Sequence, residues 1–239
     1  MHESGRHWLL LRGLIRESAH WGDFLPLLKS AFPEDKVTTL DLPGTGVHYQ
    51  QLSPTGVPEI LECVRQQAQA QGLLKQPVLL LAMSLGGMVA WQWLTRYPEE
   101  IAAACLVNIS FADRSPCYQR LRWQSWPAFL KISAQRDAYK REAAILQLIS
   151  NRPAAANQSV AQNWAEIARL RPISAANRLR QIIAAARYQP GDSAPQAPVL
   201  LLAGSADRMV ASACTQAIQR KWSLPLRCHD WAGHDLSLD

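Results

Sequence analysis

The sequence predicts an α/β protein: a mainly parallel, six-stranded sheet that is flanked by helices and carries an inserted helical cap. Apolar runs alternate with amphipathic stretches of about 10 to 15 residues, which is the pattern of consecutive βαβ units. Residues 111–197 break this alternation, because they contain helical patterns and no clear apolar strand. We therefore expect one core, made of residues 1–110 and 198–239, with residues 111–197 inserted as a helical cap.

The first half of the chain contains three predicted strands, each of them apolar or β-branched. They cover residues 7–13, 36–42 and 78–82. The third suits a strand buried on both faces, because its apolar residues follow one another without a helical period. Helices are expected at residues 21–30 and 57–71, where apolar side chains recur on one face.

The second half continues the pattern with a helix at residues 87–96, which ends before Pro98. Three further strands are expected at residues 101–109, 199–203 and 226–231. A parallel sheet gathers the loops that follow its strands at one edge, where α/β proteins bind their ligands. Candidate functional residues are therefore sought in those loops.

Ser84 lies at the turn between a predicted strand and a predicted helix. Small residues, Ala82 and Gly86, flank it with one residue between, as a strand that reverses sharply into a helix requires. Such a turn exposes the serine oxygen, and the N–H of Leu85 points from the helix N-terminus toward developing negative charge. The alternative is an ordinary turn in which the serine only caps the helix.

A serine hydroxyl needs a base, and the base needs a carboxylate that holds its tautomer. Asp207 and His234 each follow a predicted strand, so all three residues fall at the same edge of the sheet. Taken singly, Asp207 could cap the next helix and His234 could be a loop histidine. Asp113 is a second candidate for the acid, and His229, within the last predicted strand, is a weaker candidate for the base.

The chain resembles the α/β-hydrolase superfamily over nearly its whole length. The residues that carry the resemblance are Arg12-Gly13, residues 41–46 (DLPGTG), residues 84–87 (SLGG), residues 204–207 (GSAD) and Gly233-His234. The resemblance implies a catalytic triad of Ser84, Asp207 and His234. It also implies an oxyanion hole formed by the backbone N–H groups of Leu14 and Leu85.

The function that this resemblance implies is a serine hydrolase that cleaves a carboxylic ester or thioester through an acyl-enzyme on Ser84. The chain is similar to esterases such as the one that acts on pimeloyl-acyl-carrier-protein methyl ester. Two other functions stay open: carbon–carbon bond hydrolysis or a lyase reaction on the same triad, and non-catalytic binding of an anionic partner.

Arg12 stands where the superfamily usually has histidine, which places a permanent cation near the oxyanion loop. It could bind an acidic acyl group, or it could pair with a nearby carboxylate. A second difference is that the chain given ends five residues after His234, where relatives continue into a helix that covers one face of the sheet. We therefore expect that face to need another cover.

Positive charge is concentrated in residues 111–197, which carry a net charge of +8, against −2 for the rest of the chain. Most of these cations are expected on a solvated helix face. The surplus nevertheless favours an anionic substrate, or one carried by an acidic carrier protein or coenzyme A. No nucleic-acid-binding motif accompanies the charge, so nucleic acid is not an expected partner.

The sequence contains no pattern that predicts a metal site or a cofactor, and we expect neither. No apolar run approaches the roughly 20 residues of a membrane span, and the apolar run at residues 8–11 is too short for a signal peptide. Five scattered cysteines read as reduced thiols. We expect a cytoplasmic enzyme, and the sequence does not predict its oligomeric state.

Overall fold

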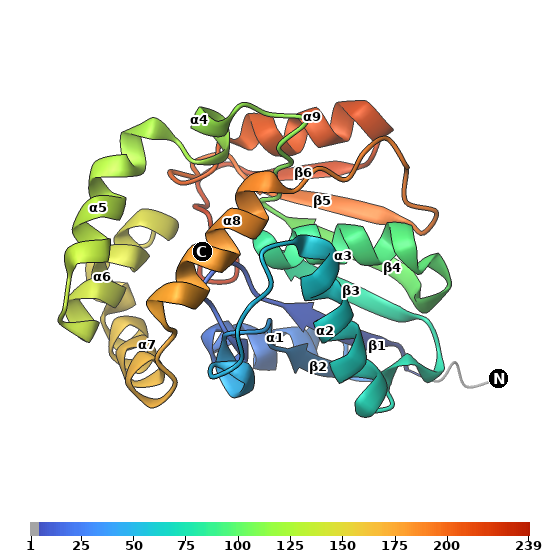
Figure 1. Ribbon diagram of the computed structural model, residues 1–239, viewed down its shortest axis with the longest axis horizontal. Helices are drawn as coiled ribbons and strands as arrows, with labels where there is room; N and C mark the ends of the chain where they lie inside the picture. Colours follow the sequence, from blue (N-terminus) through green and yellow to red (C-terminus); the bar gives the residue numbers. More distant parts are fainter. Residues whose placement is uncertain (1–4) are drawn as a thin grey trace.

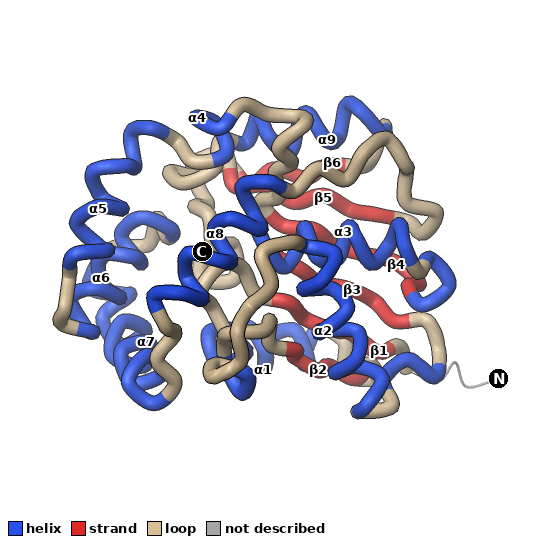
Figure 2. Tube along the Cα trace, in the orientation of Figure 1, coloured by secondary structure: helices blue, strands red, loops and turns tan. Residues whose placement is uncertain are grey.

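The computed structural model describes residues 5–239 and contains one sheet of six parallel strands in the order β2-β1-β3-β4-β5-β6. The strands are β1 (His7–Leu11), β2 (Lys36–Leu40), β3 (Val78–Met83), β4 (Ile101–Val107), β5 (Val199–Gly204) and β6 (Leu226–His229). Each falls within or next to the run that predicted it. The expected α/β class, with a parallel six-stranded sheet flanked by helices, is confirmed (Figures 1 and 2).

Four helices connect the strands of the core: α1 (Phe24–Ala31), α2 (Val57–Ala70), α3 (Leu85–Arg96) and α9 (Ser212–Trp222). Three of them, α2, α3 and α9, pack on one face of the sheet, where their side chains share a fully buried cluster with Leu80, Leu106 and Leu201. The rings of Trp91 on α3 and Trp222 on α9 meet there, with centroids 4.6 Å apart. Helix α1 packs on the opposite face.

The face beneath α1 is covered unevenly. Leu10, Leu81 and Val107 are buried in the cluster that α1 completes. On β5, by contrast, the side chains of Leu200 and Leu202, which alternate with buried residues, are only half-buried. Among the described residues, this face therefore has less helical cover at β5 than at β1.

The segment between β4 and β5 is helical and contains no strand in the described structure. In Figure 1, α5, α6 and α7 lie together beside the carboxyl ends of the strands, and α8 crosses back over the core. Helices α5, α6 and α7 share a separate apolar cluster that includes Ile132, Leu146 and Trp164, whereas Ala184 of α8 belongs to the cluster of the core. The division of the chain into a core and a cap of residues 111–197 stays a prediction. The helices of this segment are α4 (Cys117–Arg120), α5 (Trp126–Ala134), α6 (Ala138–Ile149), α7 (Gln158–Leu170) and α8 (Ala175–Arg187).

Candidate active site

Ser84 occupies the single residue between the end of β3 and the start of α3. Its backbone has φ 53° and ψ −118°, a conformation that costs free energy in any residue with a side chain. The backbone N–H of Ser84 donates to the carbonyl of Val107 on the neighbouring strand over 2.9 Å. The turn is thereby held against β4, and the serine is half-buried rather than enclosed.

The small residues around Ser84 allow backbone to approach backbone. A Cβ atom placed on Gly86 would lie 2.4 Å from the carbonyl oxygen of Arg12, and one on Gly87 would lie 2.3 Å from Ile109. A Cβ on Gly13 would lie 3.0 Å from the Cβ of Ser84. The loop that follows β1 therefore lies directly against the serine, as close packing of a strand-to-helix turn requires.

His234 and Asp207 are in contact. The Nδ1–H of His234 donates to Oδ2 of Asp207 over 2.7 Å, and both side chains are almost completely buried. The other carboxylate oxygen, Oδ1, accepts from the backbone N–H groups of Met209 and Val210 over 2.7 and 2.9 Å. These bonds fix the carboxylate, which in turn fixes the tautomer of the imidazole so that Nε2 carries no proton.

The Nε2 atom of His234 is buried and has no hydrogen-bond partner among residues 5–239. An acceptor left unpaired in this way costs about 1–3 kcal/mol in a folded protein. It is the one ring nitrogen of His234 that remains able to take a proton from a hydroxyl group. The structure therefore gives this histidine the hydrogen-bonding pattern of a general base.

Asn108 connects the ends of β4 and β5 with the histidine loop. It follows β4 with φ 48°, a conformation that asparagine tolerates better than most residues. Its Nδ2 donates to the carbonyl oxygens of Gly233 (3.2 Å) and His234 (2.7 Å), and its Oδ1 accepts from the N–H of Gly204 (3.0 Å). No motif in the sequence marks this residue; its only signal is an asparagine directly after a buried strand.

Neither alternative candidate joins these residues. Asp113 lies 3.4 Å from the guanidinium of its neighbour Arg114. His229 is exposed at the end of β6, where its ring stacks edge-on against Trp231. The carboxylate that reaches an imidazole is that of Asp207, and the imidazole is that of His234.

The two residues of the predicted oxyanion hole lie on segments next to Ser84: Leu85 follows it in the chain, and Leu14 follows Gly13, which packs against Ser84. Leu85 is the first residue of α3, where backbone N–H groups face outward. Leu14 lies in the loop after β1, and the next N–H, that of Ile15, donates to Oε1 of Gln181 over 2.9 Å. Gln181 is buried on α8 and also donates to the carbonyl of Pro43, in the loop after β2. One side chain from the helical segment therefore holds the loops after β1 and β2.

Arg12 pairs with a carboxylate, which decides between the two interpretations of this residue. Its guanidinium forms two hydrogen bonds to Asp235, the residue after His234, and a third to Ser237 Oγ at 3.0 Å. Burial tends to raise the pKa of Asp235, but the adjacent Arg12 more than offsets this and keeps that pKa below its usual value. Because the Arg12 side chain is only 2% exposed, it is not available to an acyl group.

Further ion pairs join the loop after β1 to the helical segment. Arg16 bonds to Glu142 on α6 over 2.8 Å and lies over the ring of Trp164 on α7. Glu17, the next residue, makes a bidentate pair with Arg171, just after α7. No local pattern in the sequence predicts these pairs, because the partners are more than a hundred residues apart.

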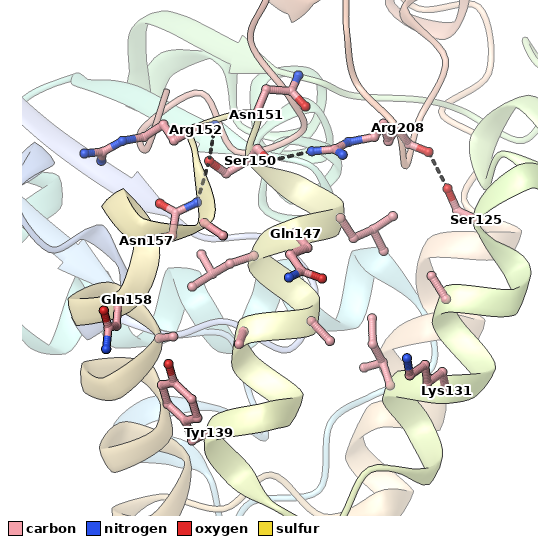
Figure 3. A pocket seen from close by; sticks show the side chains of 18 of the residues that line it. Ser125, Lys131, Tyr139, Gln147, Ser150, Asn151, Arg152, Asn157, Gln158 and Arg208 are labelled. Carbon is pink, nitrogen blue, oxygen red and sulfur yellow. Dashed lines mark hydrogen bonds between the residues drawn. The ribbon is translucent and has the colours of Figure 1, made fainter.

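A groove of about 820 Å³ lies between α5, α6 and α7, close to the loop that carries Asp207 (Figure 3). Its floor includes alanine and leucine side chains of α6, and none of its lining residues is acidic. Ser84 and His234 do not line it, so it is distinct from the serine site. Four basic side chains, those of Arg122, Lys131, Arg152 and Arg208, do line it.

Within residues 5–239, no group of three or more His, Cys, Asp and Glu side chains is arranged to hold a metal ion. The same part of the chain contains no helix with the length and apolarity needed to cross a membrane.

A parallel sheet with a strained serine at the turn from its third strand into a helix is the architecture of the α/β hydrolases. The chain belongs to the alpha/beta hydrolase family, whose family model matches residues 8–239. It is therefore a hydrolase of this family, as the sequence resemblance implied.

Individual proteins are similar to this chain in sequence or in fold. The chain is 24% identical over 226 residues to a pimeloyl-[acyl-carrier protein] methyl ester esterase from Xylella fastidiosa, covering 83% of this chain and 76% of that protein. Among solved structures, a hydrolase from Pseudomonas aeruginosa matches with a TM-score of 0.74 at 18% identity, covering 97% of this chain and 84% of that one. The enol-lactonase from Burkholderia xenovorans matches with a TM-score of 0.73 at 15% identity, covering 98% and 85%.

Proposed function

We propose that this hydrolase is a serine esterase, which cleaves a carboxylic ester or thioester through an acyl-enzyme on Ser84. The observation that carries the proposal is the state of His234: Nδ1 is bound to a fixed carboxylate, and Nε2 is buried without a partner. Ser84 and His234 both follow strands at the carboxyl edge of one parallel sheet, although no hydrogen bond joins Ser84 Oγ to Nε2 in this structure. A base prepared in this way and a serine held at φ 53° are what nucleophilic catalysis by a hydroxyl requires.

In the proposed mechanism, His234 Nε2 takes the proton of Ser84 Oγ as the oxygen attacks the carbonyl carbon of the substrate. The N–H groups of Leu14 and Leu85 stabilise the oxyanion that forms. The imidazolium then gives its proton to the departing alcohol or thiol, and the acyl group stays on Ser84. Water, deprotonated by the same histidine, releases the carboxylic acid and restores the serine.

The decisive variant is Ser84→Ala, tested against a fluorophosphonate probe and p-nitrophenyl acyl esters. We expect the wild type to be labelled and active, and the variant to be folded, unlabelled and inactive. Ser205→Ala, which removes an exposed serine after β5, is the matched control and should behave as wild type.

Labelling of Ser84→Ala equal to that of wild type would rule out the assignment. A wild type that binds anionic ligands without labelling would favour the non-catalytic binder, and cleavage of a carbon–carbon bond without esterase activity would favour the lyase or C–C hydrolase.

We also propose that the substrate is anionic or is held by an acidic carrier. Support comes from the groove of Figure 3, because among the described residues none of its four basic side chains forms an ion pair. Arg122, Arg152 and Arg208 each bond to a backbone carbonyl instead, which leaves their charge uncompensated. The curated relative from Xylella is named for a methyl ester on an acyl-carrier protein, which supports a carrier-bound substrate.

The test compares one acyl group on an acyl carrier protein with the same acyl group on N-acetylcysteamine, a small neutral thiol. We expect a lower KM for the carrier-bound form. That KM should rise with salt concentration and in the double variant Lys131→Gln/Arg152→Gln. Lys36→Gln, on β2, is the matched control for removing an exposed cation. Equal KM values for the two forms at low salt would refute the proposal that an acidic carrier holds the substrate.

A further inference from the structure

A buried ion pair joins the two loops on either side of the candidate active site. Arg12 follows β1 and precedes the loop of Leu14, and Asp235 directly follows His234. Both side chains are 2% exposed. The pair is bidentate, because Nη1 and Nη2 of Arg12 each donate to a different oxygen of Asp235. Two residues that are 223 positions apart in the chain thus connect the oxyanion loop to the histidine loop.

The surroundings of the pair hold it in one geometry. The Arg12 guanidinium lies 4.7 Å from the centre of the Trp21 ring, and Ser237 Oγ accepts from Arg12 while it donates to Asp235. The backbone N–H of Asp235 donates to the carbonyl of Ile149, at the end of α6, over 2.9 Å. Neither charge can reach solvent, so each depends on the other for compensation.

Stability alone does not account for such a pair. Taking two charges out of water costs about as much as their attraction returns, and packed apolar side chains of similar volume would often stabilise the fold equally well. A bidentate arginine–carboxylate pair provides something that apolar packing does not, which is a fixed distance and direction between two backbone segments. Here those segments carry Leu14 and His234.

We infer that Arg12 and Asp235 are positioning residues of the hydrolase: their pair sets the oxyanion loop against the imidazole of His234 and balances two opposite charges beside that imidazole. The inference rests on the proposed function, because the pair can position a catalytic base only if His234 is that base. It predicts that each half of the pair, removed alone, changes the protonation of His234 in an opposite direction.

The signs follow from the charges that remain. Without the carboxylate of Asp235, the Arg12 cation is left uncompensated and disfavours the protonated imidazole. Without Arg12, the Asp235 anion is left uncompensated and favours it. The other charges on segments packed against the histidine loop are unchanged by either substitution. They are those of Asp207, which bonds to the imidazole, of Arg122 and Arg208 around Asp207, of Asp239, which accepts from Gly233 N–H, and of Arg152, which donates to the carbonyl of Leu238.

The experiment measures kcat and KM of Arg12→Gln, Asp235→Asn and the double variant between pH 5 and 9 with a p-nitrophenyl ester. We expect the acidic limb of kcat/KM to move up by about one pH unit in Arg12→Gln and down by a similar amount in Asp235→Asn. The limb of the double variant should return close to that of wild type. In all three, kcat should fall by about 10- to 100-fold with little change in KM, because the pair no longer sets the two loops.

A matched control is Glu100→Gln, which breaks another bidentate arginine–carboxylate pair, with Arg65, just before β4 begins. It should lower the thermal midpoint and leave kcat and the acidic limb unchanged. Arg12→Lys and Asp235→Glu keep the charges, so they should keep the limb of wild type while lowering kcat. They also provide the test if a neutral variant does not fold.

Two results would overturn the inference. One is a limb that stays at the wild-type pH, or moves the same way, in both single variants. The other is wild-type kcat in Arg12→Lys and Asp235→Glu. A failure of the proposed function looks different, because wild type itself would then lack esterase activity and fluorophosphonate labelling at Ser84.

Discussion

Asp207 contacts His234 through only one of its two carboxylate oxygens. Oδ2 accepts from the imidazole, whereas Oδ1 accepts from two backbone N–H groups of the loop that carries the aspartate. The carboxylate is thus held by its own loop before it holds the histidine. A consequence is that the two oxygens can be tested separately, because one supports the loop and the other sets the tautomer.

Asp207→Asn should keep the fold and lose most of the activity. An asparagine Oδ1 can still accept from Met209 and Val210, but its NH₂ group then faces Nδ1 of His234 and forces the proton onto Nε2. A base protonated there cannot accept from Ser84, and we expect kcat to fall by about 10³- to 10⁴-fold. The measurement is kcat on a p-nitrophenyl ester together with the thermal midpoint.

Asp113→Asn is the control, because Asp113 was the other candidate acid and lies beside Arg114. It should retain activity within a few-fold of wild type. A larger loss in Asp113→Asn than in Asp207→Asn would transfer the role of the acid to Asp113.

Asn108→Ala should lower both stability and activity. The substitution removes three hydrogen bonds that join the residue after β4 to Gly204 at the end of β5 and to the histidine loop, and it places alanine at φ 48°. We expect the free energy of unfolding to fall by about 2–4 kcal/mol. Asn108→Gly loses the same bonds without the cost of the left-handed backbone, so it should be about 1–2 kcal/mol more stable than the alanine variant. Urea denaturation measures both, and two variants as stable as wild type would show that the bridge contributes nothing.

Gly86→Ala should disrupt the turn that holds Ser84. The new Cβ would lie within 2.4 Å of the Arg12 carbonyl and 2.8 Å of the Leu11 carbonyl, and neither backbone atom can move without displacing β1. We expect a loss of about 3 kcal/mol in unfolding free energy and a large loss of fluorophosphonate labelling.

Gly191→Ala is the comparison, because φ there is 76° and nothing lies within 4 Å of the added carbon. It should cost about 1 kcal/mol, from backbone strain alone, with labelling unchanged. Full labelling of a folded Gly86→Ala would contradict the close approach of the two loops.

The sequence predicted those parts of the structure that depend on neighbouring residues. All six strands form where the sequence predicted them. The plainest case is β3, whose continuous apolar run is buried on both faces along its whole length. Asp207 and His234 could be paired in advance because both follow strands of one parallel sheet. The serine turn was recognisable because close backbone contact restricts it to small residues.

Contacts between distant loops were beyond such reasoning. The partner of Arg12 lies 223 positions away, and only the folded sheet places Asp235 beside it. The same holds for Glu17 with Arg171, and for Gln181, whose amide joins two loops that no local pattern links. Loop conformations and their side-chain pairs depend on the complete fold, whereas strand positions depend on a few adjacent residues.

His20 should make the protein less stable in mild acid. Its ring is buried against Trp164, with centroids 4.9 Å apart, and its Nδ1 accepts from the N–H of Glu17. Burial, followed by the nearby cations Arg16 and Arg12, lowers the pKa of His20 well below 6.5 in the folded protein. In the unfolded chain a histidine has its ordinary pKa of about 6.5. Below that pH the histidine is protonated in the unfolded state but stays neutral in the folded state until the pH reaches its lower folded pKa.

The sign of the effect is therefore fixed: the contribution of His20 is present above about pH 6.5 and is lost as the pH falls toward its folded pKa. The free energy of unfolding should decrease by up to about 1.4 kcal/mol per pH unit from this residue. His20→Phe keeps a ring beside Trp164 but cannot titrate. The unfolding free energy of wild type should therefore fall relative to that of His20→Phe as the pH falls from 7 to 5. His7→Gln is the control, because burial lowers the pKa of the partly exposed His7 only modestly. Urea midpoints at pH 7, 6 and 5 measure the difference, and a gap between wild type and His20→Phe that stays constant with pH would mean that His20 is protonated in the folded protein as readily as in the unfolded chain.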